Sequence, residues 1–133
     1  MEVTLALLCD AASVTEEGKL NVLGQFDHVF VDTYPLRMWP KCIAMRMAGS
    51  HDEFQDVQPF AVRGYNEAGK EMGEIRGTVE PRQQPQDADL VYAVAILPLF
   101  DPHIPEPGSY RLDVVLREEV VASIDLQAHL RAV

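Results

Sequence analysis

Four histidines are the first residues of this chain that could do chemistry, because imidazole binds metals and exchanges protons near neutral pH. They are His28, His51, His103 and His129. The densest polar group is His51-Asp52-Glu53, and Asp101-Pro-His103 could join it if the fold brings the two loops together. No Cys/His pattern has zinc spacing, and a closed zinc site needs converging ligands that the sequence does not spell out. We therefore expect no metal and no cofactor.

The acidic loops leave calcium as the alternative cation. Calcium is held by about six to eight oxygens that converge from loops. The sequence lacks an Asp-x-Asp-x-Asp-Gly run and has a single Asp87-Ala-Asp89. A calcium or small-ligand binding domain that uses these loops is therefore the alternative function. The loop acids are Asp52, Glu53, Asp56, Asp87, Asp89 and Asp101.

The candidate nucleophiles lack the surroundings that would activate them. None of the serines stands in a Gly-x-Ser-x-Gly elbow. Cys9 and Cys42 lie in apolar runs, which is typical of inert buried thiols rather than low-pKa nucleophiles. A phosphate-binding loop and a dinucleotide fingerprint are also missing from the sequence. We therefore predict a protein that is not an enzyme, and a hydrolase of unrecognised type is the alternative. The serines are Ser13, Ser50, Ser109 and Ser123.

One connection, residues 34–40, is unusually rich in side chains that favour binding. It holds the only tryptophan of the chain between two prolines. Trp, Tyr and Arg are enriched at binding hot spots. The alternative is that the loop folds over the open end of the sandwich and plugs its core, since large aromatic side chains are mostly buried within their own domain. The candidate interaction residues are Tyr34, Arg37, Met38 and Trp39.

The charge of the chain argues against nucleic acid and anionic membranes as partners. The net charge is -10, the isoelectric point is about 4.7, and lysines and arginines are dispersed. Binding to phosphate groups requires clustered basic residues. The acidity agrees with solubility, and its alternative interpretation is a cation or a basic protein partner. We predict a cytoplasmic protein for three reasons. The N-terminus is acidic and does not resemble a signal peptide, no apolar run reaches about 20 residues, and the two cysteines are expected to be free.

The elements that must position these residues are strands. Residues 104–126 contain two alternating runs joined by a polar turn at 117–119, and a period of two predicts one buried face and one exposed face. We expect Leu112 and Ile124 to point inward. The inward-facing sets are Tyr110, Leu112, Val114 and Leu116 in the first run, and Val120, Ala122, Ile124 and Leu126 in the second.

Further strands are predicted along the rest of the chain. They cover residues 3–9, 20–30, 42–47, 60–65, 72–80 and 90–97. Asn66 and Gly69 supply the turn of a hairpin, and Gly24 indicates a bulge or a close backbone approach. Residues 90–97 are apolar at both parities, which predicts a central strand. A helical turn is the alternative for residues 11–17. The chain is predicted to be one all-β domain, residues 1–133, an antiparallel β-sandwich of roughly eight strands, immunoglobulin-like in general plan.

Several motifs carry a resemblance to a family of proteins. They are the apolar opening Val3-Thr-Leu-Ala-Leu-Leu-Cys, the following Asp-Ala-Ala, the Glu-Gly-Lys-Leu-Asn, the Leu-Gly that ends at Gly24, and the late Pro-Gly-x-Tyr. In these the chain resembles an uncharacterised bacterial family of small β-sandwich proteins of unknown function. The resemblance extends over most of the chain. It implies the same β-sandwich and transfers no activity.

The leading hypothesis for function is a non-catalytic binding or assembly module. Its partner would be a protein or a second copy of the chain, contacted through edge strands or through residues 34–40. Edge strands offer unpaired N–H and C=O groups to an added strand, which is the physical reason for this choice.

Overall fold

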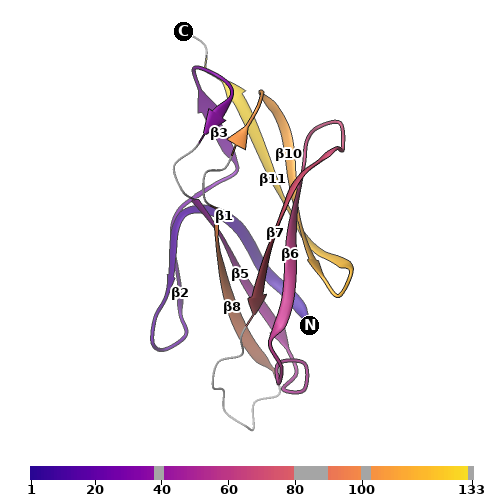
Figure 1. Cartoon of the computed structure of the whole chain (residues 1–133). Helices are drawn as coiled ribbons and strands as arrows, with labels where there is room; N and C mark the ends of the chain where they lie inside the picture. Colours follow the sequence, from indigo (N-terminus) through magenta and orange to yellow (C-terminus); the bar gives the residue numbers. More distant parts are fainter. Residues whose placement is uncertain (38–40, 80–89, 100–102, 132–133) are drawn as a thin grey trace.

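Two β-sheets stack face to face in the computed structural model, which describes residues 1–37, 41–79, 90–99 and 103–131 (Figure 1). The first sheet has the order β2-β1-β5-β8 and the second has the order β3-β11-β10-β6-β7. The predicted all-β sandwich is confirmed, with no helix among the described residues. The bounds in the first sheet are β1 (Glu2–Val14), β2 (Leu20–Phe26), β5 (Lys41–Gly49) and β8 (Val91–Leu99).

The sequence predicted an antiparallel sandwich, and the second sheet departs from this prediction. Its strand β3 runs parallel to β11. A further pair, β4 (Leu36–Arg37) with β9 (His103–Ile104), lies outside both sheets. Over the described residues, the two sheets together hold nine strands. The bounds in the second sheet are β3 (His28–Val31), β6 (Gln58–Tyr65), β7 (Glu71–Val79), β10 (Gly108–Leu116) and β11 (Glu119–Leu130).

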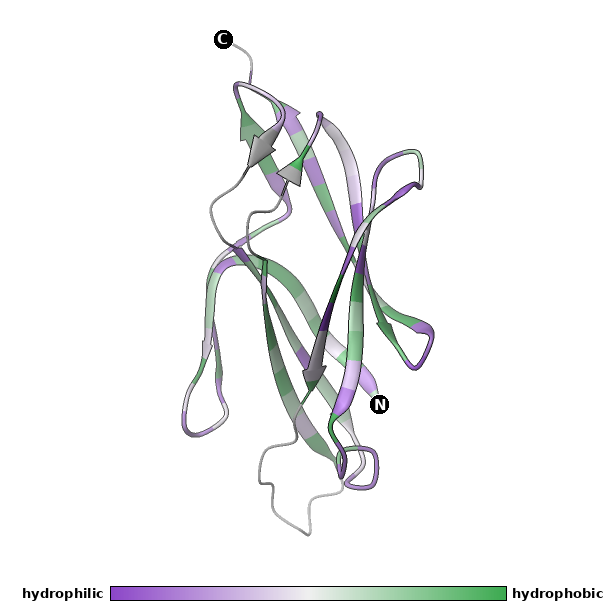
Figure 2. Cartoon of the chain, in the orientation of Figure 1, coloured by the Kyte–Doolittle hydropathy of each residue, from purple (hydrophilic) through white to green (hydrophobic). Residues whose placement is uncertain are grey.

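The core lies between the two sheets. Because side chains alternate along a strand, each sheet points one of its two faces into this core. Figure 2 shows the apolar character of β5 and β8 along their length. Ile43, Met45 and Met47 of β5 are fully buried, and they face Val114 of β10 across the same cluster. Burying side chains of this size stabilises the fold by about 1.5–3 kcal/mol each.

The closing hairpin has the predicted pairing, with one correction at its tip. Leu112 pairs with Ile124, and Ile124 is buried. The turn is two residues, Arg117 and Glu118, both with positive φ, as a tight hairpin turn requires. A register shift between Val114 and Val115 moves the tip out of phase. Val120, predicted to face inward, is therefore 58% exposed.

The first strand is longer than predicted, and the helical alternative for residues 11–17 is wrong. β1 pairs with β5 through its first part and with β2 through its second part. Gly24 of β2 has a φ of +68°, a conformation that favours glycine. A Cβ at this position would collide with the Asp10 carboxylate. Gly24 is thus a point of close approach, the second of the two alternatives predicted for it.

The single strand predicted for residues 20–30 is two strands. β2 ends at Phe26 and β3 begins at His28, and they belong to different sheets. The interruption at Asp27 lets the chain cross from one sheet to the other. The prediction of a central strand over residues 90–97 is also wrong, because β8 ends its sheet. Its apolar outer side chains reflect a partly covered sheet face rather than a central position.

The entry into β10 matches the resemblance to immunoglobulin-like sandwiches at one specific contact. The Tyr110 hydroxyl donates a hydrogen bond to the Glu106 carbonyl, four residues upstream, at 2.5 Å. Such a tyrosine corner fixes a connection at the end of a sandwich.

Among the described residues, no helix is long and apolar enough to cross a membrane.

Candidate functional site

The candidate site is the free edge of β7, the last strand of the five-stranded sheet. β7 pairs with β6 on one side, and among the described residues no further strand pairs with its other side. The strand is nine residues long and contains no proline. Its N–H and C=O groups on the free side can pair with an added strand. Two of its apolar side chains are unusually exposed, Met72 at 41% and Ile75 at 40%.

The hairpin that positions β7 follows from local turn chemistry. The Asn66 side chain accepts a hydrogen bond from the Lys70 amide at 2.9 Å, and Gly69 has a φ of +82°. This confirms the predicted turn. A register shift then places Tyr65 opposite Glu71 and Gly64 opposite Gly73, which leaves Met72 as the extra residue of a bulge.

The inner face of β7 is buried at the Val79 end of the strand and exposed toward Gly73. Val79 is fully buried, and a Cβ on Gly77 would lie 2.8 Å from the Phe60 ring. Ile75 and Gly73 have the same parity and so point the same way. Yet Ile75 is exposed, and a Cβ on Gly73 would meet nothing within 4 Å. The opposite sheet therefore does not cover this half of β7.

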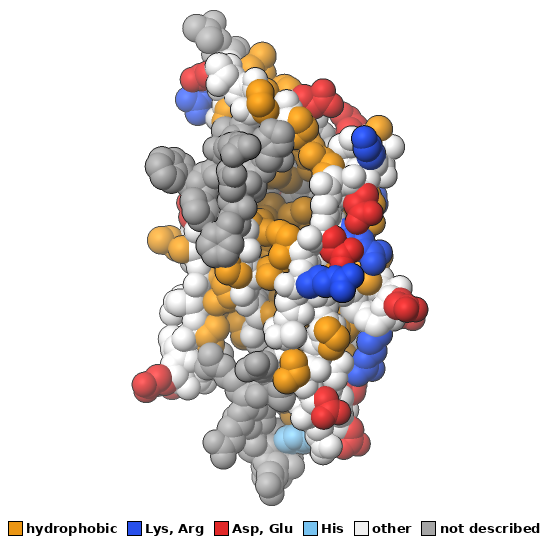
Figure 3. All heavy atoms as spheres, in the orientation of Figure 1, with side chains coloured by type: hydrophobic (Ala, Val, Ile, Leu, Met, Phe, Trp, Pro, Cys, Tyr) orange, Lys and Arg blue, Asp and Glu red, His pale blue; other side chains and the backbone are white. Residues whose placement is uncertain are grey.

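An apolar cavity of about 280 Å³ lies beneath that open half. Figure 3 shows hydrophobic side chains around a hollow on this side of the molecule. Arg111 and Glu74 contribute polar groups, and the Arg111 guanidinium lies 4.9 Å from the centre of the Tyr65 ring. The other apolar lining residues include Val62, Leu99, Ile104, Leu112 and Leu126.

Charges on the outer face of β7 form a small network. Glu74 accepts hydrogen bonds from Arg76 at 2.7 Å and from Arg63 at 3.2 Å. Hydrogen bonds from Arg76 and then Arg63 lower the pKa of the Glu74 carboxyl, which is therefore ionised at neutral pH. The Arg76 side chain is almost wholly exposed and is available to further partners.

The other free edges are less suited to strand addition. β8 carries Pro98, which removes a main-chain donor from its ladder. β3 has only four residues. β2 has seven residues and contains the left-handed Gly24, which interrupts a regular edge. β7 contains neither proline nor a residue with positive φ, and beyond the bulge at Met72 its ladder is regular from Gly73 to Val79.

The candidate interaction residues near position 34 are only partly placed. Tyr34 is half-buried against the core, and its hydroxyl donates to the His129 carbonyl at 2.7 Å. The Tyr34–Pro35 peptide bond is cis. Arg37 lies in β4, whose main chain pairs with His103 of β9. Met38 and Trp39 lie outside the described residues, so the prediction for Trp39 stays a prediction.

The histidines gather differently from the sequence hypothesis. His28 and His129 lie on adjacent strands, with Nδ1 and Nε2 2.9 Å apart, and Phe30 stacks on His129. His51 is elsewhere, in the loop after β5. Within the described ranges, no three His, Cys, Asp or Glu side chains form a group that could hold a metal ion. Asp87, Asp89 and Asp101 of the calcium hypothesis lie outside those ranges.

The two cysteines are buried neighbours on β1 and β5. Their Sγ atoms are 3.3 Å apart, and both thiols are free. Burial, with added effects from Cys42, raises the pKa of Cys9 to about 12. A thiol with so high a pKa is protonated at neutral pH, and it is the thiolate that acts as a nucleophile.

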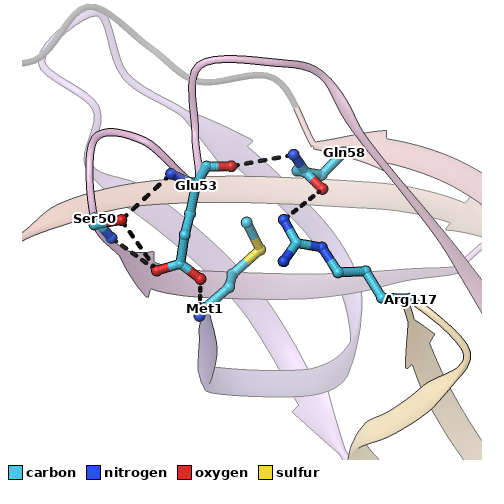
Figure 4. Close-up of polar contacts among 5 residues, drawn as sticks. All are labelled: Met1, Ser50, Glu53, Gln58 and Arg117. Carbon is cyan, nitrogen blue, oxygen red and sulfur yellow. Dashed lines mark hydrogen bonds and ion pairs between the residues drawn. The ribbon is translucent and has the colours of Figure 1, made fainter.

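The loop residue Glu53 serves the fold (Figure 4). Its carboxylate pairs with the amino group of Met1 and accepts a hydrogen bond from the Ser50 amide at 3.0 Å. These contacts lower its pKa to about 2. Gln58 donates to the Glu53 carbonyl at 3.1 Å and accepts from Arg117 at 3.3 Å. The cluster joins the start of β1, the loop after β5 and the turn between β10 and β11.

The sequence pattern held one signal for the β7 edge that was not used. The run that forms β7 contains three charged residues, Glu71, Glu74 and Arg76. Charged side chains at both odd and even positions are typical of an edge strand. The cavity had no such signal, because it arises from where the opposite sheet ends. Its lining comes from six strands of both sheets and the outlying β9.

Fold and site together define a two-sheet β-sandwich with one long free edge beside an apolar cavity. The chain belongs to a family described as "Family of unknown function (DUF6941)", whose model matches residues 4–129. The expected membership of an uncharacterised family is thereby confirmed. Among curated proteins, none matches the chain.

Proposed function

We propose that the protein is a non-catalytic protein-binding module whose contact surface is the free edge of β7. The observation that carries the proposal is the exposure of Ile75, an inward-facing residue of an edge strand that no opposite sheet covers. An extended segment added at this edge would pair with the main chain of β7. It could also place an apolar side chain over Ile75 and the cavity, which is how strand addition combines affinity with specificity.

The non-catalytic part of the proposal is supported by the character of the candidate nucleophiles. Cys9 has a raised pKa and is buried. A reactive cysteine needs the opposite, a lowered pKa and access to solvent. Two free thiols 3.3 Å apart also suit a reducing compartment, so we propose that the module works in the cytoplasm.

The edge of β7 is favoured over residues 34–40 as the contact surface. The Tyr34 hydroxyl donates a hydrogen bond to the His129 carbonyl, and its side chain packs against the core. This position supports the alternative that the segment closes the end of the sandwich. The exposed apolar groups of β7 have no such internal use.

The proposal can be tested by selecting random peptides from a display library against the folded protein. The selected peptides should be extended, rich in β-branched and aromatic residues, and should slow amide exchange in β7. Ile75→Lys should abolish their binding, because a charge on an edge strand opposes strand addition. Val120→Lys is the matched control, since Val120 is also exposed but lies at the far hairpin. Peptides that bind both variants equally, or protect another strand, would refute the proposal.

A small apolar ligand is the second candidate, because the cavity of about 280 Å³ is close to the lower limit of ligand pockets. The probe is 1-anilinonaphthalene-8-sulfonate, which fluoresces in apolar sites. Gly73→Leu should fill the open space above Gly73 and reduce probe binding. If the probe does not bind, or binds this variant and the wild type equally, the ligand hypothesis is rejected.

A further inference from the structure

We propose that the strand added at the β7 edge is β7 of a second copy, in an antiparallel pairing centred on Ile75. This inference rests on the proposed function and names its partner. Pairing two identical edges about a two-fold axis gives a closed dimer, the commonest symmetry among soluble oligomers. The five-stranded sheet would then continue from one copy into the other.

Geometry leaves few registers for such a pairing. In an antiparallel sheet, directly opposed residues lie on the same face, so each residue of one β7 must face a residue of the same parity in the other. The residue on the two-fold axis faces itself. Each possible dimer is therefore defined by its central residue, and the sequence of β7 decides among them.

Charge favours Ile75 as the centre. With Ile75 on the axis, Glu74 of each copy lies opposite Arg76 of the other, which gives two cross-strand ion pairs. Opposed unlike charges stabilise a strand pair, and like charges destabilise it. Centring on Glu74 or on Arg76 would place that charge against itself. A centre at Gly73 would place Arg76 opposite Lys70, a like charge, and a centre at Gly77 would place Arg76 opposite the uncharged Thr78, so neither forms the two ion pairs.

The inner face fits the same register. Ile75 of one copy lies against Ile75 of the other, so the exposed apolar side chain is covered at the axis. Gly73 of each copy lies opposite Gly77 of the other, and glycines allow close approach of the two backbones. The register that pairs the charges is therefore also the one that buries the exposed isoleucine.

A charge exchange tests both the surface and its register. At about 100 µM, a concentration that would populate dimers of micromolar affinity, the wild type should sediment as a dimer. Glu74→Arg and Arg76→Glu should each weaken dimerisation by about tenfold or more, because two attractive pairs become repulsive. An equimolar mixture of the two variants should recover the dimer, since Glu and Arg then face each other again.

The control is Glu17→Arg, an identical change at an exposed residue of the turn between β1 and β2. It should leave the dimer intact. Circular dichroism and thermal melts establish that every variant is folded. A monomeric wild type would overturn the dimer but not the proposed function, which the peptide selection tests separately. A dimer unaffected by Glu74→Arg, or variants that do not recover on mixing, would overturn the β7 register.

Discussion

Tyr34 and His129 are joined by a hydrogen bond from the tyrosine hydroxyl to the histidine main-chain carbonyl, 2.7 Å long. The bond ties the segment that follows β3 to the last strand of the fold. Both residues belong to the end of the sandwich where β3 runs parallel to β11. Tyr34 thus makes a contact within the fold, at a place separate from the edge of β7.

Replacing Tyr34 with phenylalanine should reduce stability while leaving association unchanged. The loss should be about 0.5–1.5 kcal/mol, the net contribution of one intramolecular hydrogen bond. Burial raises the pKa of Tyr34, in agreement with a hydroxyl removed from water. Urea unfolding measures the loss. An unchanged midpoint, together with weaker association of Tyr34→Phe, would instead return this segment to the candidate binding surfaces.

The closing hairpin provides a graded test of burial. Ile124→Ala should cost about 2–5 kcal/mol, because Ile124 is buried in the main core cluster. Leu112→Ala should cost less, since Leu112 is only half-buried and borders the cavity. Val120→Ala, at the exposed tip, should change stability by less than about 0.5 kcal/mol. Equal losses in thermal or urea unfolding for all three would mean that the register of the hairpin is wrong.

The pattern of residues predicted strands well and predicted their neighbours poorly. Alternation places Ile124 inward because period two is a local property of the chain. It cannot place β8 at a sheet edge, because which strand lies next to β8 depends on residues far away. The same limit applies to Tyr34, because composition could not predict that its hydroxyl bonds the main chain of His129, 95 residues later.

The candidate site was largely beyond sequence reasoning for a related reason. Met72 and Ile75 look like ordinary strand residues, and their exposure results from the end of the opposite sheet. The turn at Asn66 and Gly69 was predictable, because it depends on side-chain hydrogen bonding and positive φ within five residues.

Cys9 and Cys42 should resist alkylation in the native protein. Both are buried, and the raised pKa of Cys9 leaves little thiolate at neutral pH. Mass spectrometry after treatment with iodoacetamide should find neither thiol modified in the folded chain and both modified after unfolding in guanidinium. A disulfide found in protein prepared without oxidant would contradict the proposal of a reducing compartment.

Glu53 predicts a specific loss of stability in acid. Its carboxyl has a folded pKa of about 2 and an ordinary value of 4.5, so the contribution of its ionised form is fully present above pH 4.5. That contribution is lost progressively as the pH falls from 4.5 toward 2. Urea midpoints of wild type and Glu53→Gln should therefore differ most at neutral pH and converge near pH 2. A difference that does not depend on pH would show that the ion pair with Met1 is not its source.

Amide hydrogen exchange across β7 tests the central claim, the use of this edge as the contact surface, most directly. It should be followed in the wild type at about 1 µM and about 100 µM, and with a peptide selected from the display library. We predict that β7 gains protection at the higher concentration through the second copy, and on peptide addition through strand pairing, while the β2 edge is unchanged. If β7 exchanges at the same rate under all three conditions, or protection appears on β2 or β8 instead, the account is contradicted.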